Sequence, residues 1–324
     1  MNAPQTKALT GFNRRAIPQE AVETRWQAAD GYELRRIDWA VPQGVCRGSI
    51  LFLPGRGDAY EKYLETLDYW HRQGWQVTAS DWRGQAGSGR LGSDDVTGHI
   101  SDFRYWVDDL ASLWADWRSS TPGPHVLIGH SMGGHLVLRT IAEGKVEPDA
   151  AVLIAPMLDF IRHGVPMPIM HAAAWLMAKI GDPRRQAWKW GEKPRAVPAD
   201  RIRLLTGDED RYGDELWWRE HRPGIAMGPG SWGWVSAAYS SVRGLWKRGV
   251  LEALKTPILL LCAENDRLVS PDAIEKAAAR LPRGELLRFG REARHELLRE
   301  VDPIRDQALA GIDGFLDRVV PRSN

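Results

Sequence analysis

Short apolar runs rich in β-branched residues alternate with amphipathic stretches along most of this chain. Runs that predict buried strands cover residues 49–53, 76–80, 125–129, 150–154, 257–262 and 285–289. Helical periodicity follows these runs, over residues 60–73, 103–118, 136–143, 271–281 and 303–319. Regular alternation of strand and helix is typical of a mainly parallel sheet covered by helices on both faces. The sequence therefore predicts an α/β fold.

The start of the chain departs from this alternation. Residues 24–28 and 32–41 alternate apolar and polar side chains around an Asp30–Gly31 turn, which predicts an antiparallel hairpin. Residues 1–21 lack the basic start and following apolar stretch of a secretory signal. We expect a flexible or surface-packed lead-in there, and a cytoplasmic protein.

The alternation also stops between residues 156 and 250, which predicts a core of residues 22–155 and 251–324 that carries residues 156–250 as an inserted cap. The most apolar stretch, Val165–Ile180, contains two prolines and is shorter than the ~20 residues needed to span a bilayer. We expect it to belong to the cap and to make peripheral contact with a membrane surface. Half of the sixteen tryptophans also fall in the cap: Trp175, Trp188, Trp190, Trp217, Trp218, Trp232, Trp234 and Trp246. Some of them should line an apolar pocket.

Composition narrows the classes of function. The 43 basic and 42 acidic residues give a formal net charge of +1, which leaves no electrostatic footprint for nucleic acid. An apolar content of 43% is enough for a substantial core. The two cysteines, Cys46 and Cys262, stand in or beside predicted core strands, so no disulfide framework is expected.

The strongest chemical motif is a serine in a G-x-S-x-G frame. Ser131 stands between Gly129 and Gly133, after the predicted strand Pro124–Ile128 and before the predicted helix Leu136–Glu143. In a nucleophile elbow the glycines avoid collisions at a sharp strand-to-helix turn, so that the serine projects from a strained backbone. The motif and its flanking elements predict that Ser131 is a catalytic nucleophile.

A serine nucleophile needs a base, and the base needs an acid that orients it. In the α/β-hydrolase order of serine, acid and histidine, only His295 fits as the base, because the other eight histidines precede any candidate acid in the C-terminal third. Asp266 follows the predicted strand 257–262, at the edge where open parallel sheets place their chemistry. Glu264 and Asp159 are the alternatives, and Asp266 is preferred because its turn leads directly into a helix start.

An oxyanion hole completes such a site. One of its backbone amides comes from the residue after the nucleophile, which is Met132, and the other from the loop after the third strand. That loop is Pro54–Asp58, in which Arg56 is the best candidate for the second donor.

With these residues placed, the chain resembles the lysophospholipase and monoacylglycerol lipase branch of the α/β-hydrolases, and bacterial lysophospholipases most of all. The resemblance runs from about Gly48 to Glu300 and departs from the family pattern in two places. Pro54 stands where many relatives have histidine, and Ala86 and Gly87 precede Ser88 in the D-x-R-G-x-G-x-S segment. The segments that carry the resemblance are Leu53–Arg56, Asp81–Gln85, Gly98–Phe103, Gly129–Gly134 and Arg294–Leu298.

The resemblance implies a cofactor-independent serine hydrolase that cleaves carboxylic esters with an acyl chain, with lysophospholipids or monoacylglycerols as the expected substrates. No metal is expected, because His295-Glu296 is followed by no second histidine at helical spacing. The segment Pro229–Trp234 is similar to a cap segment of the bacterial relatives, which makes Trp232 and Trp234 the leading candidates for the substrate pocket. Other chemistry on the same triad stays open, as in a thioesterase, a peptidase or a small-ester esterase. A catalytically silent binding protein of the same fold also stays open.

Overall fold

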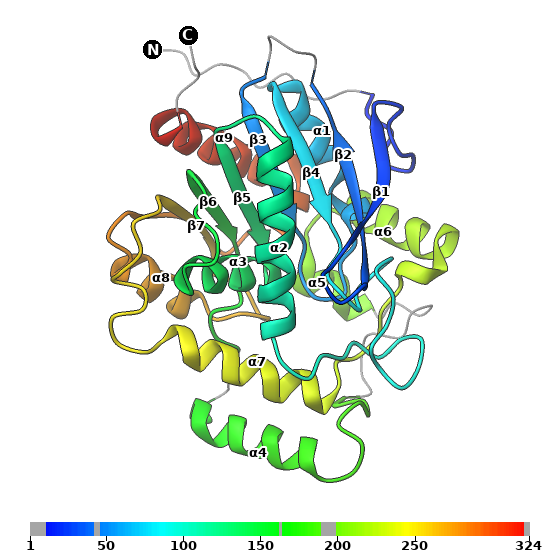
Figure 1. Ribbon diagram of the computed structural model, residues 1–324, viewed down its shortest axis with the longest axis vertical. Coiled ribbons are helices and arrows are strands. Elements are labelled where there is room, and N and C mark those ends of the chain that lie inside the picture. Colours follow the sequence, from blue (N-terminus) through cyan, green and yellow to red (C-terminus); the bar gives the residue numbers. More distant parts are fainter. Residues whose placement is uncertain (1–10, 42–45, 162–163, 189–198, 321–324) are drawn as a thin grey trace.

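An eight-stranded sheet forms the centre of the protein in a computed structural model that describes residues 11–41, 46–161, 164–188 and 199–320. The strand order is β1-β2-β4-β3-β5-β6-β7-β8 (Figure 1). The strands are β1 (Ala21–Gln27), β2 (Glu33–Trp39), β3 (Gly48–Leu53), β4 (Trp75–Ser80), β5 (His125–His130), β6 (Ala150–Ile154), β7 (Ile258–Ala263) and β8 (Gly284–Phe289). The hairpin β1–β2 is antiparallel and joins β4 antiparallel, whereas β4 and the strands beyond it run parallel.

Helices cover both faces of this sheet, because side chains at successive positions of a strand point to opposite faces. Ile50 and Phe52 of β3 belong to the apolar cluster that contains helices α1 (Leu64–Arg72) and α9 (Asp302–Val319). Leu51 and Leu53 instead belong to the cluster on the other face, with α2 (Arg104–Ser120), α3 (Met132–Ala142) and α8 (Pro271–Arg280). This arrangement confirms the predicted fold class of a mainly parallel sheet with an N-terminal hairpin and helices on both faces.

Among the described residues, the segment between β6 and β7 contains four α-helices. They are α4 (Met167–Lys179), α5 (Ala199–Leu205), α6 (Glu209–His221) and α7 (Trp232–Leu245). In Figure 1, α7 lies below the sheet and α4 packs beneath α7, at the bottom of the molecule. We propose residues 156–250 as the cap on this basis. Trp190, one of the predicted cap tryptophans, lies outside the described residues.

Element boundaries differ from the predictions most clearly around the nucleophile. Helix α3 begins at Met132, directly after Ser131, whereas the sequence predicts a start at Leu136. The difference arises because Gly133 and Gly134 lower the helical propensity of this turn but are required by packing. A Cβ added to Gly133 would lie 2.2 Å from the carbonyl oxygen of Leu53. The predicted helix 60–73 is also divided, into the 3₁₀ turn Tyr60–Tyr63 and α1.

The lead-in is ordered where the structure describes it. Arg14 and Arg15 both form ion pairs with Asp214 of α6, so this part of the lead-in contacts the segment between β6 and β7. Residues 1–10 lie outside the described part of the chain. Among the described residues, no helix combines the length and the apolar character needed to cross a membrane.

Candidate active site

Ser131 occupies a strained turn between β5 and α3. Its φ of 52° lies in the left-handed region that residues with a Cβ rarely adopt, and its amide donates to the carbonyl of Ile154 on the neighbouring strand. The glycines on either side let this turn pack closely, since a Cβ added to Gly129 would lie 2.6 Å from the carbonyl carbon of Gly133. The sharp turn holds Ser131 at the carboxyl edge of the sheet, as a nucleophile elbow requires.

Asp266 and His295 meet at the same edge. Nδ1 of His295 lies 2.6 Å from Oδ2 of Asp266, and both side chains are buried. The other carboxylate oxygen of Asp266 accepts hydrogen bonds from the amides of Leu268 and Val269, at 2.8 and 3.1 Å. These bonds fix the carboxylate, and the carboxylate in turn orients the imidazole.

The two alternative acids are occupied elsewhere. Glu264 pairs with Arg291 at 3.1 Å on the surface, and Asp159 accepts a hydrogen bond from the amide of Phe160 at 2.8 Å. Of these three carboxylates, Asp266 is the one that contacts His295.

The pairing shifts the protonation of both partners. Burial by itself lowers the pKa of His295, but the adjacent Asp266 carboxylate outweighs burial and raises the pKa above its usual value. Burial opposes ionisation of Asp266, yet the interaction with His295 and the two amide hydrogen bonds leave its pKa below the usual value. Asp266 is therefore ionised at neutral pH and stabilises a protonated His295.

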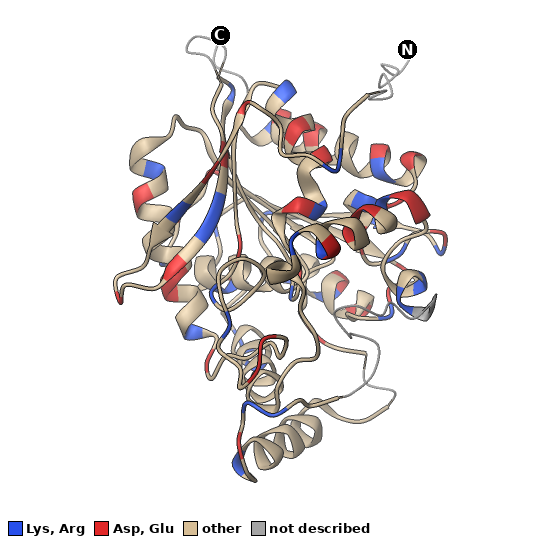
Figure 2. Ribbon diagram, turned by 90° about the vertical axis from the view of Figure 1, so that its right-hand side faces the viewer, with Lys and Arg blue, Asp and Glu red and all other residues tan. Residues whose placement is uncertain are grey.

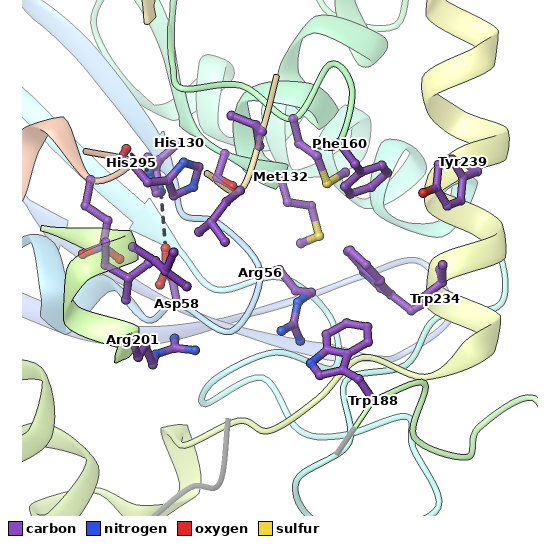
Figure 3. Close-up of a pocket in the computed structure, with 18 residues that line it drawn as sticks. Arg56, Asp58, His130, Met132, Phe160, Trp188, Arg201, Trp234, Tyr239 and His295 are labelled. Carbon is purple, nitrogen blue, oxygen red and sulfur yellow. Dashed lines mark hydrogen bonds and ion pairs between the residues drawn. The ribbon is translucent and has the colours of Figure 1, made fainter. Parts of the chain in front are cut away.

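Ser131 and His295 face one cavity of about 670 Å³ (Figure 3). Its polar side contains His130, Asp58 and Glu296, beside His295. Much of the remaining lining is apolar, and Phe160, Trp188, Trp234 and Tyr239 lie at the end away from His295 (Figure 3). The other apolar residues of the lining are Met132, Met157, Leu204, Leu205, Val235, Leu268 and Val269. Such a lining suits a substrate that combines a reactive polar group with a long apolar portion.

Comparison with known proteins shows the family of this chain. A family model described as serine aminopeptidase, S33, matches residues 44–302. The chain belongs to this hydrolase family. The predicted resemblance to the lysophospholipase and monoacylglycerol lipase branch of the α/β-hydrolases is thereby confirmed, together with the matches below.

Relatives of known name cover most of the chain. Lysophospholipase L2 of Escherichia coli strain K12 is 32% identical over 281 residues, which cover 83% of this chain and 80% of that protein. A probable lysophospholipase L2 of Haemophilus influenzae is 26% identical and covers 85% of this chain and 86% of its own length. Among solved structures, a soluble variant of the monoglyceride lipase of Saccharomyces cerevisiae in complex with a substrate analog matches with a TM-score of 0.73. It is 18% identical and covers 97% of this chain and 99% of that chain, so it supports the fold.

The loop after β3 lies against the nucleophile of this S33 family member. A Cβ added to Gly55 would lie 3.1 Å from Cβ of Ser131. The amide of Gly57 donates to the side chain of Gln85 at 2.9 Å, and the amide of Ser131 donates to a strand carbonyl. The amides of Arg56 and Met132 are therefore the ones we propose for the oxyanion hole.

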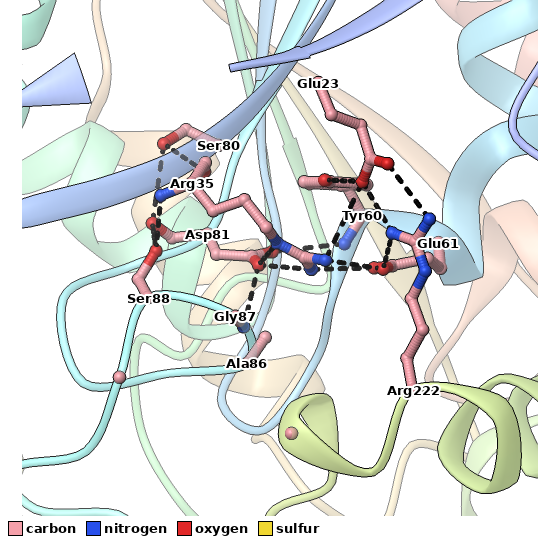
Figure 4. Close-up of polar contacts among 12 residues, drawn as sticks. Glu23, Arg35, Tyr60, Glu61, Ser80, Asp81, Ala86, Gly87, Ser88 and Arg222 are labelled. Atoms are coloured by element: carbon pink, nitrogen blue, oxygen red, sulfur yellow. Dashed lines mark hydrogen bonds and ion pairs between the residues drawn. The ribbon is translucent and has the colours of Figure 1, made fainter. Parts of the chain in front are cut away.

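A network around Arg35 and Asp81 contacts the residues that follow this loop (Figure 4). Arg35 of the hairpin binds both Asp81 and Glu61, and Asp81 accepts from the amides of Tyr60 and Gly87. Asp81 begins the segment that supplies Gln85, the partner of the Gly57 amide. The network thereby connects the hairpin to the loop that carries the Arg56 amide.

The segment from Asp81 to Ser88 contains one of the two departures from the family pattern. Ala86, where the family pattern has glycine, adopts a φ of 42°, and left-handed backbone favours glycine. The segment keeps a fixed path because Ser88 accepts from the amide of Arg35 at 2.8 Å and donates to the carbonyl of Asp81 at 3.1 Å. The residues Ala86 and Gly87 thus do not disturb the hydrogen bonds that hold the loop.

Sequence reasoning missed a buried ionic cluster next to His295. Its centre, Lys62, contacts Asp58, Glu296 and Glu215 at 2.5, 2.6 and 3.0 Å. Arg299 contacts Glu296 and Glu215, and Arg219 contacts Glu215 at 2.6 Å. We call these three carboxylates and three cations the Lys62 cluster. Because Glu215 and Arg219 belong to α6, the cluster joins the proposed cap to the residue that follows His295.

The two tryptophans predicted for the pocket have different outcomes. Trp234 lines the cavity, whereas Trp232 is not among the described residues of its lining, so a pocket role for Trp232 stays a prediction. Both belong to α7, where two positions correspond to a rotation of about 200° and therefore to opposite sides of the helix. Phe160 and Tyr239, which the sequence did not single out, line the cavity beside Trp234.

Proposed function

We propose that this chain is a serine hydrolase that cleaves carboxylic esters carrying an acyl chain, with lysophospholipids or monoacylglycerols as its substrates. The observation that carries the proposal is the Asp266–His295 pair beside Ser131 at one end of a cavity with a largely apolar wall. Two bacterial relatives that match most of the chain are named lysophospholipase L2 and probable lysophospholipase L2. These names support the same substrate class.

The residues take the following roles in the proposed reaction. Ser131 attacks the ester carbonyl while His295 accepts the serine proton, and the amides of Arg56 and Met132 stabilise the negative charge that develops on the carbonyl oxygen. His295 then returns the proton to the leaving alcohol, which leaves an acyl group on Ser131. Water, activated by His295, cleaves the acyl-enzyme in a second step and regenerates the serine. Asp266 keeps the imidazole in position and stabilises its charged form throughout.

The apolar wall of the cavity favours esters over peptides. An acyl chain can lie between Phe160, Trp234 and Tyr239 without leaving a polar group buried and unpaired, whereas a peptide backbone would bury donors and acceptors there. A thioester carries the same acyl chain, so substrate profiling rather than the cavity separates esters from thioesters.

We further propose that α4 docks on lipid surfaces. Ile169, Trp175 and Leu176 are exposed by 59%, 53% and 52%, and Ile180 directly after the helix by 56%. Lys179 is the one charged residue of the helix, and α4 accordingly shows almost no charge at the bottom of Figure 2. Helix α4 packs on α7, which lines the cavity through Trp234 and Tyr239. An apolar surface in this place can bring an acyl chain from the lipid surface to the active site.

A fluorophosphonate probe and a substrate panel test the proposed activity. We expect the probe to label the wild-type protein at Ser131, and we expect esters with long acyl chains to be hydrolysed faster than acetyl esters or peptides. A folded protein that resists the probe and cleaves no ester would instead be a binding protein of this fold.

A further inference from the structure

The loop that carries His295 exchanges hydrogen bonds with the junction between α5 and α6. The amide of Glu296 donates to the carbonyl of Leu205 at 2.8 Å. The guanidinium of Arg294 donates to the carbonyl of Thr206. The residue before His295 and the residue after it are therefore both bound to this junction.

A buried carboxylate joins the two segments. Oε1 of Glu300 accepts a hydrogen bond from the amide of Arg294 at 2.9 Å. Its other oxygen, Oε2, accepts from the amide of Gly207 in the junction at 2.8 Å and from the amide of Val301 at 3.3 Å. Hydrogen bonds to an ionised carboxylate are stronger than those between neutral groups, and Glu300 is fully buried, away from competing water. The carboxylate thus fixes the backbone next to His295 to the backbone of the junction.

The same junction borders the substrate cavity. Leu204 and Leu205, at the C-terminal end of α5, belong to the described lining together with Ser131 and His295. A substrate that fills the cavity therefore contacts the segment to which Glu300 ties the loop of the histidine.

We propose that Glu300 is a positioning residue, which holds the loop of His295 against the α5–α6 junction so that the imidazole stays in place for its reaction with Ser131. This inference rests on the proposed function, because that function makes His295 the base. Glu300 acts through the amide of Arg294 and is not among the described residues of the cavity lining. A misplacement of about 1 Å can slow a reaction about a hundredfold, so a small displacement of the loop is enough to impair proton transfer.

The pKa of the imidazole reports its position. Burial lowers the pKa of His295, and the carboxylate of Asp266, hydrogen-bonded to its Nδ1, outweighs burial and raises it. The substitutions at positions 300 and 207 leave every surrounding charge in place, so a shift of this pKa measures a movement of the imidazole relative to Asp266. The charged and titratable groups around the imidazole and its carboxylates are Asp266, Asp58, His130, Glu296, Lys62 and Arg299.

Glu300→Gln is the first test. A glutamine keeps the size of the side chain but presents one oxygen and one NH₂ group, so the amide of either Arg294 or Gly207 then faces another donor. We expect kcat/KM for a soluble ester to fall by about tenfold to a hundredfold. We also expect the acid limb of the pH profile to move to lower pH, because the imidazole moves away from Asp266.

Asp214→Asn is the matched control for the loss of a buried carboxylate. Asp214 also belongs to this part of the chain, in α6, but its printed ion pairs are with Arg14 and Arg15 of the lead-in. We expect this variant to be less stable than the wild type, with the acid limb of its pH profile unmoved.

Gly207→Ala approaches the same contact from the junction, and it carries the test if Glu300→Gln does not fold. A Cβ added to Gly207 would lie 2.9 Å from Oε2 of Glu300, so the carboxylate has to shift. We expect kcat/KM to fall and the acid limb to move to lower pH, as in Glu300→Gln. Gly213→Ala in α6 is its control, since a Cβ there would lie 3.9 Å from its nearest neighbour, a nitrogen of Arg15, and it should behave as the wild type.

NMR of histidine-labelled protein measures the pKa of His295 without turnover, with its resonance assigned by its absence from His295→Gln. A wild-type pKa in folded Glu300→Gln and Gly207→Ala would overturn the inference. A loss of activity that follows the unfolded fraction in a thermal melt, with the acid limb unmoved, would overturn it as well and leave only a structural role for Glu300. If the wild type hydrolysed no ester, the proposed function would be wrong, and a lowered pKa in both variants would still support the positioning of His295 by Glu300.

Discussion

At the scale of the residue, the proposed reaction depends on the hydroxyl oxygen of Ser131. Ser131→Ala removes the attacking oxygen and adds no volume at the elbow, so the fold should persist. We expect kcat with any ester to fall by about 10³-fold or more, as is usual for a triad nucleophile. Ester hydrolysis and a thermal melt of the same preparation check this expectation. A folded variant with wild-type turnover would contradict the role of Ser131.

The protonation of His295 gives a second prediction at this scale. His295 must be neutral to accept the proton, so kcat/KM declines as the pH falls through its pKa in the free enzyme. Because Asp266 raises that pKa, the acid limb of the wild-type profile should lie above the ordinary histidine value of about 6.5.

Asp266→Asn removes the charge that causes this shift. The acid limb should therefore move to lower pH, and kcat should fall by about 10³-fold or more because the imidazolium loses its partner. The pH dependence of kcat/KM, measured for both proteins with one soluble ester, is the check. An acid limb at the same pH in both proteins would show that another group, and not Asp266, is the acid.

At the scale of the element, glycine sets the distance between α3 and β3. A Cβ at position 133 would lie 2.2 Å from the carbonyl oxygen of Leu53 and 2.5 Å from that of Pro54. Gly133→Ala therefore pushes the helix away from the loop that carries Arg56, and we expect a loss of about 1–3 kcal/mol in unfolding free energy. We expect kcat/KM to fall by at least about tenfold, since the oxyanion donors must be placed to within about 0.5 Å.

Gly244 of α7 provides the control for this substitution. A Cβ there meets nothing within 4 Å, and alanine is the better helix former. Gly244→Ala should keep activity and leave stability equal or slightly higher, as measured by chemical denaturation. If Gly133→Ala kept the same activity and stability as Gly244→Ala, the proposed effect of packing at Gly133 would be contradicted.

The Lys62 cluster gives a second prediction at this scale. Lys62→Met leaves Asp58, Glu215 and Glu296 buried without their common cation, and breaking a buried pair in this way costs about 3–5 kcal/mol. Lys145, whose pair with Asp108 is exposed, is the control, and Lys145→Met should cost no more than about 1 kcal/mol. Urea denaturation of both variants at neutral pH measures the difference. Equal losses would mean that burial adds nothing to the cluster.

At the scale of the whole molecule, the exposed face of α4 is the surface that we propose to dock on lipid. Changing Ile169, Trp175 and Leu176 together to serine removes apolar area that is already more than half exposed, so the melting temperature should change little. If α4 docks on lipid, hydrolysis of long-chain substrates in vesicles should fall by at least about tenfold, while hydrolysis of a soluble short-chain ester persists.

Half-buried residues of the same helix are the comparison. Met167→Ser together with Met170→Ser should instead lower the melting temperature, because these side chains are partly packed. If the exposed triple variant lost activity equally on soluble and vesicle substrates, the face would have a structural role and the docking proposal would fail.

Local sequence determined much of this protein. Strand and helix positions follow from periodicity, because each element buries its own apolar face. The places of Ser131, Asp266 and His295 follow as well, because a parallel sheet brings the ends of its strands to one edge and chain order distinguishes the roles. Their catalytic roles stay predictions until turnover is measured.

Tertiary structure alone decided what depends on the direction of a side chain or on contacts between distant segments. The sequence could not distinguish Trp232 from Trp234, since only the packing of α7 determines which side of the helix meets the cavity. It gave no sign of the Lys62 cluster, whose members lie up to 241 positions apart, from Asp58 to Arg299, and include Glu215 and Arg219 of α6, which meet the others only in the folded chain. The side chain of Arg56 lines the cavity for the same reason, since its guanidinium carbon lies 5.3 Å from the ring centres of Trp188 and Trp234, which are distant in the sequence.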